Sequence, residues 1–231
     1  MATEDLFTPI HKGLRSMLYG LSGRLQTNDF ADLATTNGLV TDLEYDFAVA
    51  RSAGCILCTL NHHATDEESE IFPSVAKVES RLVPQLIEEH HELTRRELAI
   101  AQRAHALLAL ASKEERVDEG TRVNQDFNEL FALYLTHMNR EETELVPMMQ
   151  RHFTDDQMVG MRSRIIAQMP PDRLFSILGW MLPSMNVTEL ATLLSSVRQG
   201  APPPFFQAVT KLCAEKVDAA RWSEVTARIG L

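Results

Sequence analysis

One segment of this sequence is present twice, and the repeated pattern constrains the fold more than any other feature. Residues 63–73 read HATDEESEIFP and residues 137–147 read HMNREETELVP, so that His, Glu, Glu, Glu and Pro share the same offsets. Each copy begins with His-x-x-x-Glu. Residues four apart lie on the same face of a helix, so each copy directs an imidazole and a carboxylate toward one neighbour. Two such helices facing each other would form a metal site of the kind found in helical bundles.

Apolar residues recur at helical spacing through most of the chain, while strand signals are nearly absent. The sequence therefore predicts an all-α protein, an up-down-up-down antiparallel four-helix bundle with a C-terminal helical appendage. The four predicted helices run from Phe7 to Leu25, from Thr41 to near Pro73, from about 80 to 112, and from about 119 to 151.

Turn-forming residues predict how the first two helices are separated. The segment 28–38 (NDFADLATTNG) is expected to close the first helix. Thr41 is expected to cap the second helix, with Glu44 three residues later in capping-box spacing. Phe47, Ala50 and Gly54 are then expected to continue its apolar stripe.

The pattern changes beyond Thr154, where shorter segments are separated by prolines. Thr188 and Asp218 are expected to cap short helices there, and both tryptophans lie in this part of the chain. We therefore predict two parts, residues 1–153 as the bundle with its metal site and residues 154–231 as an appendage. The bundle motifs assign no function to the appendage.

The other two bundle helices each offer a histidine in phase with the apolar stripe. His11 lies one turn before Leu14, and His90 lies four residues after Leu86 and three before Leu93. His90 is therefore favoured over its neighbour His91. On the second helix the repeat itself favours His63 over His62, because His63 and His137 both stand ten residues before a proline.

The other polar residues are expected to have structural or solvent-exposed roles. Cys55 and Cys58 form a C-x-x-C that is expected to lie mid-helix as two buried thiols, with zinc or redox chemistry as the alternative. His105 and His152 are expected to be structural or exposed. Glu68 and Glu142 follow the ligand glutamates directly, point about 100° away, and are expected to support the ligands or face solvent.

Composition excludes several classes of partner. The chain has 22 Lys and Arg against 32 Asp and Glu, a net charge of −10. Binding to nucleic acid or to an anionic membrane surface is therefore not expected. The three cysteines do not suggest a disulfide framework, and the N-terminal residues do not resemble a signal peptide. We expect a cytoplasmic protein.

Taken together, these motifs resemble those of the hemerythrin-like (HHE cation-binding) domain, and they cover about residues 7–152. The likeness rests on one His on the first helix, His-x-x-x-Glu-Glu…Phe-Pro on the second, Glu-His-x-x-Leu on the third, and His-x-x-x-Glu-Glu…Pro on the fourth. The resemblance implies a non-haem di-iron centre, with oxo or hydroxo bridging as one form. It implies these six metal ligands: His11, His63, Glu67, His90, His137 and Glu141.

The resemblance also implies how the ligands are divided. His11 and His63 would serve one iron and His90 and His137 the other, with both glutamates bridging. Oxygen-carrying members have a further histidine one turn after the third-helix ligand, where this chain has Thr94. A hydroxyl is a poor replacement for imidazole on iron, so the chain resembles bacterial and regulatory members more closely. Manganese or zinc would also suit these ligands.

Three hypotheses for function follow. The first is a di-iron protein that binds or senses dioxygen, nitric oxide or peroxide, or responds to cellular iron. The second is a di-iron oxidase or peroxidase, which needs an acid/base group beside the metals. The third is a helical interaction module with a structural metal, in which residues 154–231 bind a protein partner or a second copy.

Overall fold

The computed structural model describes residues 3–43, 55–79 and 81–231, and these residues are helical apart from short connections. No strand is found among them, which confirms the all-α class. The α-helices are α1 Thr8–Thr27, α2 Leu33–Asp42, α3 Ile56–Asp66, α4 Phe72–Val75, α5 Leu82–Leu107, α6 Lys113–Arg140, α7 Val146–His152, α8 Asp155–Gln168, α9 Pro171–Ser184, α10 Val187–Gly200, α11 Pro203–Lys216 and α12 Ala219–Ile229. Two π-helical turns, η1 Glu67–Ile71 and η2 Glu141–Leu145, interrupt the second and fourth long stretches.

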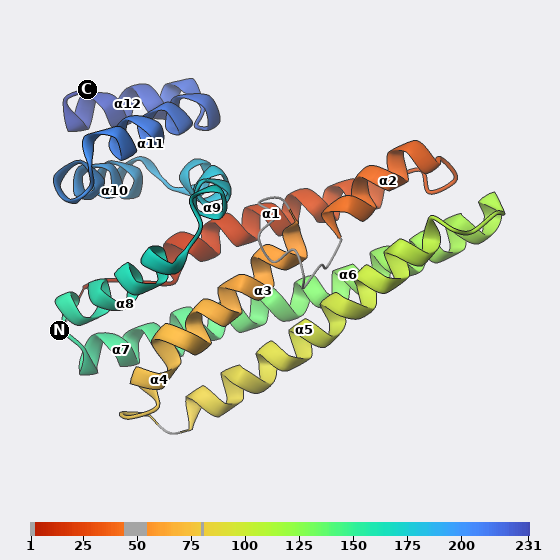
Figure 1. Ribbon diagram of the computed structural model, residues 1–231, viewed down its shortest axis with the longest axis horizontal. Coiled ribbons are helices and arrows are strands. Elements are labelled where there is room, and N and C mark those ends of the chain that lie inside the picture. The colour runs from red at the N-terminus through yellow and green to blue at the C-terminus, as the bar shows by residue number, and fades with distance from the viewer. Residues whose placement is uncertain (1–2, 44–54, 80) are drawn as a thin grey trace.

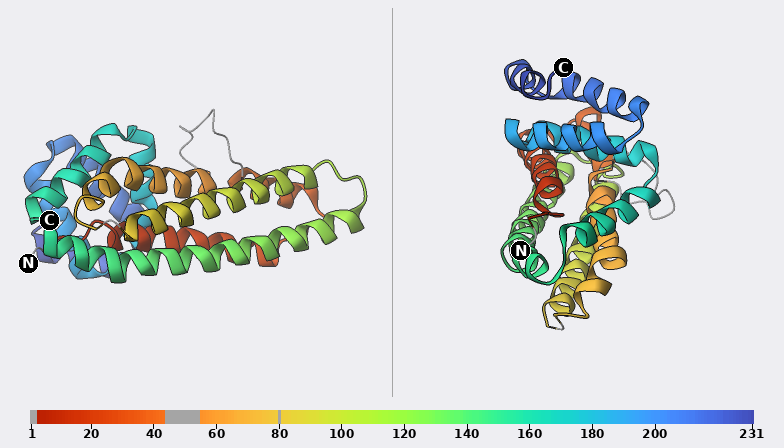
Figure 2. Two further views of the ribbon diagram at one scale, coloured as in Figure 1. Left: turned by 90° about the horizontal axis from the view of Figure 1, so that it is seen from below. Right: turned by 90° about the vertical axis from the view of Figure 1, so that its left-hand side faces the viewer.

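Four long helical stretches lie side by side in Figures 1 and 2: α1, α3 with η1 and α4, α5, and α6 with η2 and α7. Their apolar faces form a continuous buried cluster that includes Leu18, Leu57, Leu93 and Phe127. A second buried cluster, at the end where α4 and α7 lie, includes Phe7 and Phe72. The rows of inward-facing residues expected from helical spacing are thus buried.

The connection between the first two long helices differs from the sequence prediction. The segment 28–38 was expected to be a turn, but only its beginning is one, because Asp32 caps α2 by accepting from the Ala34 N–H. Thr41 lies inside α2, where its hydroxyl donates to the Asn37 carbonyl, so its prediction as an N-cap is wrong. The expectations for Glu44, Phe47, Ala50 and Gly54 lie outside the described residues.

The start of α3 also differs from the prediction. Cys55 is the N-cap of this helix, and its Sγ accepts from the Cys58 N–H at 3.1 Å. The C-x-x-C therefore lies at a helix start and not mid-helix. Both thiols are buried, as expected, and none of the three cysteines is in a disulfide.

The fourth long stretch begins earlier than expected. Ser112 caps α6 by accepting from the Glu115 N–H, so the helix starts about six residues before the predicted position. Pro84 lies in the first turn of α5, where its missing N–H costs little.

The C-terminal helices pack against the end of the molecule that carries η1. Helix α9 packs against α1, and α10, α11 and α12 stack beyond it (Figure 1). Helix α8 contributes Met158 and Met161 to the same buried cluster as Phe7, whereas α9 to α12 share a cluster of their own. The division of the chain at 153/154 stays a prediction.

Capping residues define the ends of these short helices. Asp218 caps α12 as expected, by accepting from the Arg221 N–H. Thr188 was expected to cap a helix, but Asn186 caps α10, with Glu189 completing the capping box. Asn186 comes two residues earlier, and its side chain also accepts from a backbone N–H. The predicted N-cap was therefore two residues too late in the chain.

Candidate metal centre

The six predicted ligand residues come together in the structure as two overlapping groups. One group contains His11, His63, Glu67 and Glu141, and the other contains Glu67, His90, His137 and Glu141. In each group the candidate ligand atoms all lie within 4.8 Å of one another. Five of the six side chains are buried and His63 is 13% exposed.

The imidazoles meet in pairs across the helices. Nε2 of His11 lies 3.1 Å from Nε2 of His63, and Nε2 of His90 lies 2.9 Å from Nε2 of His137. All four rings therefore direct the same nitrogen toward the centre of the site. Two neighbouring pairs of imidazole nitrogens are a donor set that suits transition metals.

Each buried glutamate divides its two oxygens between the two groups. Oε1 of Glu67 lies 2.9 Å from Nε2 of His63, and its Oε2 lies 3.3 Å from Nε2 of His90. Glu141 is arranged in the same way, with Oε2 at 3.3 Å from His11 and Oε1 at 3.4 Å from Nε2 of the histidine one turn before it. Both carboxylates thus face two groups at once, which is the arrangement of a bridging ligand.

Both glutamates stand at the first position of a π-helical turn. The Phe72 N–H donates to the Glu67 carbonyl, five residues back, and the fourth helical stretch repeats this bond. In each copy a proline, Pro73 or Pro147, follows in the first turn of the next α-helix, where its missing N–H costs little. Such π-bulges are frequent at functional sites because they re-aim side chains.

Three of the four imidazoles have a carboxylate on their outer nitrogen. Nδ1 of His11 lies 2.9 Å from Oε1 of Glu142, and Nδ1 of His90 lies 2.8 Å from Oε1 of Glu68. Nδ1 of His137 lies 2.8 Å from Oε2 of a third glutamate, Glu89. A proton held on Nδ1 leaves the Nε2 lone pair free for a metal. Glu68 and Glu142 therefore contact the candidate ligand histidines, which agrees with one of the two roles expected for them.

The electrostatics of the site indicate a deficit of positive charge. Burial and the neighbouring carboxylate of Glu67 raise the pKa of Glu141 to about 7. Burial also acts to raise the pKa of Glu67, but the imidazoles of His63 and His90 hold that pKa well below its usual value. Burial acts to lower the pKa of His90, but the carboxylates of Glu67, Glu141 and Glu68 together raise it to about 9. The site retains protons where a metal cation would replace them.

The carboxylate oxygens give the same indication. Within the described residues, none of the four oxygens of Glu67 and Glu141 accepts a hydrogen bond of ordinary geometry, although all four are buried. Buried carboxylates without partners are costly unless a cation binds them. The residues present therefore fit a metal centre.

The neighbouring residues that were set aside lie outside both groups. His91 is 68% exposed, His62 is half-buried, and His105 and His152 are exposed. Thr94 is half-buried, and its Oγ1 accepts from Nδ2 of Asn61 at 3.3 Å. The choices of His63 and His90 thus agree with the arrangement of the site, while the role of the six residues as ligands stays a prediction.

Sequence reasoning assigned no role to Glu89 or Glu97. Glu89 contacts His137 from the neighbouring helix, which spacing along one helix does not reveal. Glu97 is fully buried seven residues after His90 and accepts from the Tyr134 hydroxyl. Its position in the apolar stripe, between Leu93 and Ile100, was a signal that could have identified it.

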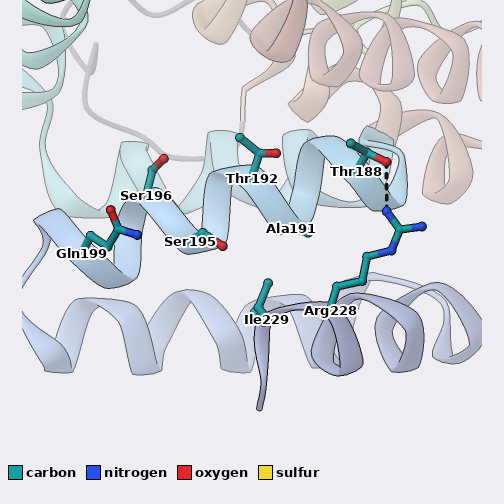
Figure 3. Close-up of a pocket in the computed structure, with 8 residues that line it drawn as sticks. All are labelled: Thr188, Ala191, Thr192, Ser195, Ser196, Gln199, Arg228 and Ile229. Atoms are coloured by element: carbon teal, nitrogen blue, oxygen red, sulfur yellow. Dashed lines mark hydrogen bonds between the residues drawn. The ribbon is translucent and has the colours of Figure 1, made fainter.

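A separate groove lies on the C-terminal helices. It has a volume of about 400 Å³ and runs between α10 and α12, and Figure 3 shows Arg228 on α12 donating to the hydroxyl of Thr188 on α10. No histidine or carboxylate lines it. The groove therefore lacks the donor set of the metal centre.

Comparison with known proteins identifies the family. The model of the hemerythrin HHE cation-binding domain matches residues 5–149, and this protein belongs to that family. Its members bind metal ions, typically iron, and the clustered histidines and glutamates here fit such a site. No curated protein and no solved structure matches the chain. Among the described helices, none combines the length and apolar character needed to cross a membrane.

Proposed function

We propose that this protein is a di-iron member of the family that binds or senses dioxygen, nitric oxide or peroxide, or responds to cellular iron. The observation that carries the proposal is the division of each bridging carboxylate between two histidine pairs. One iron is assigned to His11 and His63 and the other to His90 and His137. Glu67 and Glu141 would be shared by the two irons.

An antiparallel up-down-up-down arrangement of four helices is part of this proposal. It brings one histidine from each long helical stretch to the same level, so a metal would connect all four stretches. The cytoplasmic location is also proposed, and the three thiols, none of which is in a disulfide, are consistent with a reducing compartment.

Two histidines and two shared carboxylates give each iron about four protein ligands, which leaves coordination positions open. Iron bound there would supply redox chemistry and bind small ligands at those positions. The protein contributes the rest of the site. Glu68, Glu89 and Glu142 hold the Nδ1 protons, and the surrounding apolar side chains, such as Phe7 and Phe72, exclude water.

Metal analysis of the purified protein, combined with absorption spectra under air and without oxygen, tests the proposal. We expect two irons per chain and a spectrum that changes on exposure to oxygen, nitric oxide or peroxide. A single metal per chain, or a loaded protein whose spectrum responds to none of these ligands, would contradict it.

One observation favours an enzyme as the second candidate. An oxidase or peroxidase needs an acid/base group that exchanges protons with the metal centre, and Glu97, two turns after His90 on α5, is a buried carboxyl whose pKa is raised to about 8, chiefly by burial. Catalytic consumption of peroxide by the iron-loaded protein, in excess over the metal present, would identify this function. A stoichiometric spectral change without turnover would exclude it.

A further inference from the structure

Glu97 is a carboxyl group inside an apolar core. Its side chain is 0% exposed, and it lies on the buried face of α5 between Leu93 and Ile100. Its Oε1 accepts from the hydroxyl of Tyr134 on α6. Its Oε2 is buried and has no hydrogen-bond partner among the described residues. A buried carboxyl group with an oxygen that lacks a hydrogen-bond partner destabilises the fold.

Among the described residues, the groups that face Glu97 include no lysine or arginine. They are Tyr134 on α6, Cys58 on α3, and His90 two turns away on the same helix. Within the part of the chain that the structure describes, Glu97 forms no ion pair with a lysine or arginine. Burial and Cys58 raise the pKa of Glu97, whereas Tyr134 and His90 lower it, and the result is about 8. The carboxyl therefore holds a proton at neutral pH and loses it in mildly alkaline solution.

The same two helices connect Glu97 to the metal centre. His90 precedes Glu97 by seven residues on α5, an axial distance of about 10 Å. Tyr134 precedes the candidate ligand His137 by three residues on α6. At this separation in a protein interior, an ionised Glu97 would weaken the binding of a unit negative charge at the centre about tenfold.

We propose that in mildly alkaline solution, where Glu97 is ionised, the Glu97–Tyr134 pair takes up the proton that accompanies the binding of an anion at the metal centre. This rests on the proposed function. The ligands are small anions, or ligands that gain negative charge when bound. The anion binds and one solvent proton converts the Glu97 carboxylate to the acid, so the net charge of the core is unchanged. The Tyr134 hydroxyl stabilises the ionised form and so sets the pH at which the uptake occurs.

Azide titrations of the iron-loaded full chain at pH 6 and pH 9 test the proposal, with Glu97→Gln as the main variant. Glutamine has the same shape but never ionises. We expect equal azide affinity in wild type and Glu97→Gln at pH 6, and about tenfold tighter binding by the variant at pH 9. Comparison of the two proteins at the same pH removes competition from hydroxide, which acts on both.

Two further variants separate the pair from general effects. Tyr134→Phe removes the hydrogen bond that favours ionised Glu97, so the pH at which azide affinity declines should move upward. Glu129→Gln removes one negative charge from an exposed side chain on α6 and should behave as wild type at both pH values. If azide still binds but its affinity depends on pH equally in wild type and Glu97→Gln, the role of Glu97 is overturned while the proposed function stands.

Infrared spectroscopy gives a readout that needs no bound ligand. In the metal-free protein at neutral pH, the difference spectrum between wild type and Glu97→Gln should contain the C=O band of a buried carboxylic acid, separate from any contribution of Glu141. A wild-type protein without a band that depends on Glu97 would overturn the proposal. Failure of the iron-loaded wild type to bind azide at either pH would overturn both the proposal and the proposed function.

Discussion

The carboxylate of Glu142 lies 2.9 Å from Nδ1 of His11, although the two residues are 131 positions apart in the chain. The first repeat makes the matching contact, because Glu68 lies 2.8 Å from Nδ1 of His90. In each repeat, therefore, the first glutamate faces the centre and the second holds a histidine of a neighbouring helix. A π-helical turn begins at the first glutamate in both copies, so one local irregularity positions two carboxylates for two different tasks.

Loss of either bridging glutamate should remove both metals. Each of Glu67 and Glu141 contacts both histidine pairs, so we expect Glu67→Ala and Glu141→Ala to bind less than one iron per chain. Elemental analysis of protein purified in parallel is the measurement. Glu144→Ala, which changes a 56% exposed glutamate in the same repeat, should keep its iron. One fully occupied iron in either bridging variant would contradict the shared role.

The two histidine doublets provide internal controls. His63→Ala and His90→Ala should each lose metal, because each removes a nitrogen from the centre. His62→Ala and His91→Ala should keep the wild-type metal content, since neither side chain belongs to the two groups of candidate ligands. Metal content and the absorption spectrum can be compared within each pair. The side chain of His91 is 68% exposed. Metal loss on replacing it would show that His91 contributes to the metal centre, contrary to the helix phase that favours His90.

Removal of the metal should destabilise the whole fold. Ligands from all four long helical stretches make metal binding part of the folding free energy. At a free metal concentration a thousand times the dissociation constant, the stabilisation is about 4 kcal/mol, or roughly 10 °C in melting temperature for a chain of this size. Calorimetry of the loaded and chelator-treated protein measures it. Identical melting temperatures would show that the metal does not connect the helices.

Glu97→Gln should stabilise the metal-free protein in a pH-dependent way. The pKa of Glu97 is about 8 in the folded chain and near 4.5 when unfolded, so between these values only the folded state holds the proton. Wild-type stability therefore falls as pH rises through this window, by at most about 1.4 kcal/mol per pH unit. The gain from Glu97→Gln should grow from pH 4.5 to 8 and then stay constant. Urea unfolding at several pH values checks this, and a gain independent of pH would contradict it.

The close approach of α1 and α9 should tolerate no side chain at Gly13. A Cβ atom there would lie 3.0 Å from backbone atoms of Met181, so Gly13→Ala should separate the helices at a cost of about 1–3 kcal/mol. Gly23→Ala, on the same helix with nothing within 4 Å of the added atom, should stabilise by up to about 1 kcal/mol. Denaturant unfolding and limited proteolysis of the C-terminal helices compare the two. Equal effects would mean that α9 does not pack closely on α1.

Most of the metal centre could be predicted from the sequence because its geometry is local to each helix. The spacing His-x-x-x-Glu puts His63 with Glu67, and His137 with Glu141, on one face of a helix, whatever that helix packs against. The phase of the apolar stripe similarly selected His11 and His90. The start of α3 was harder to place, because its N-cap is Cys55, which is not one of the residue types that usually cap helices.

What only the tertiary structure decided are the contacts between helices. The assignments of Glu142 to His11, Glu68 to His90 and Glu89 to His137 depend on how the helices are rotated and aligned against each other. Periodicity within one helix contains no such information. The sequence by itself determined which side chains face inward and that their chemical types suit a metal ion. The packing decided which oxygens face two histidine pairs, and that Glu97 lies beside Tyr134 in the core, because these relations join residues far apart in the chain.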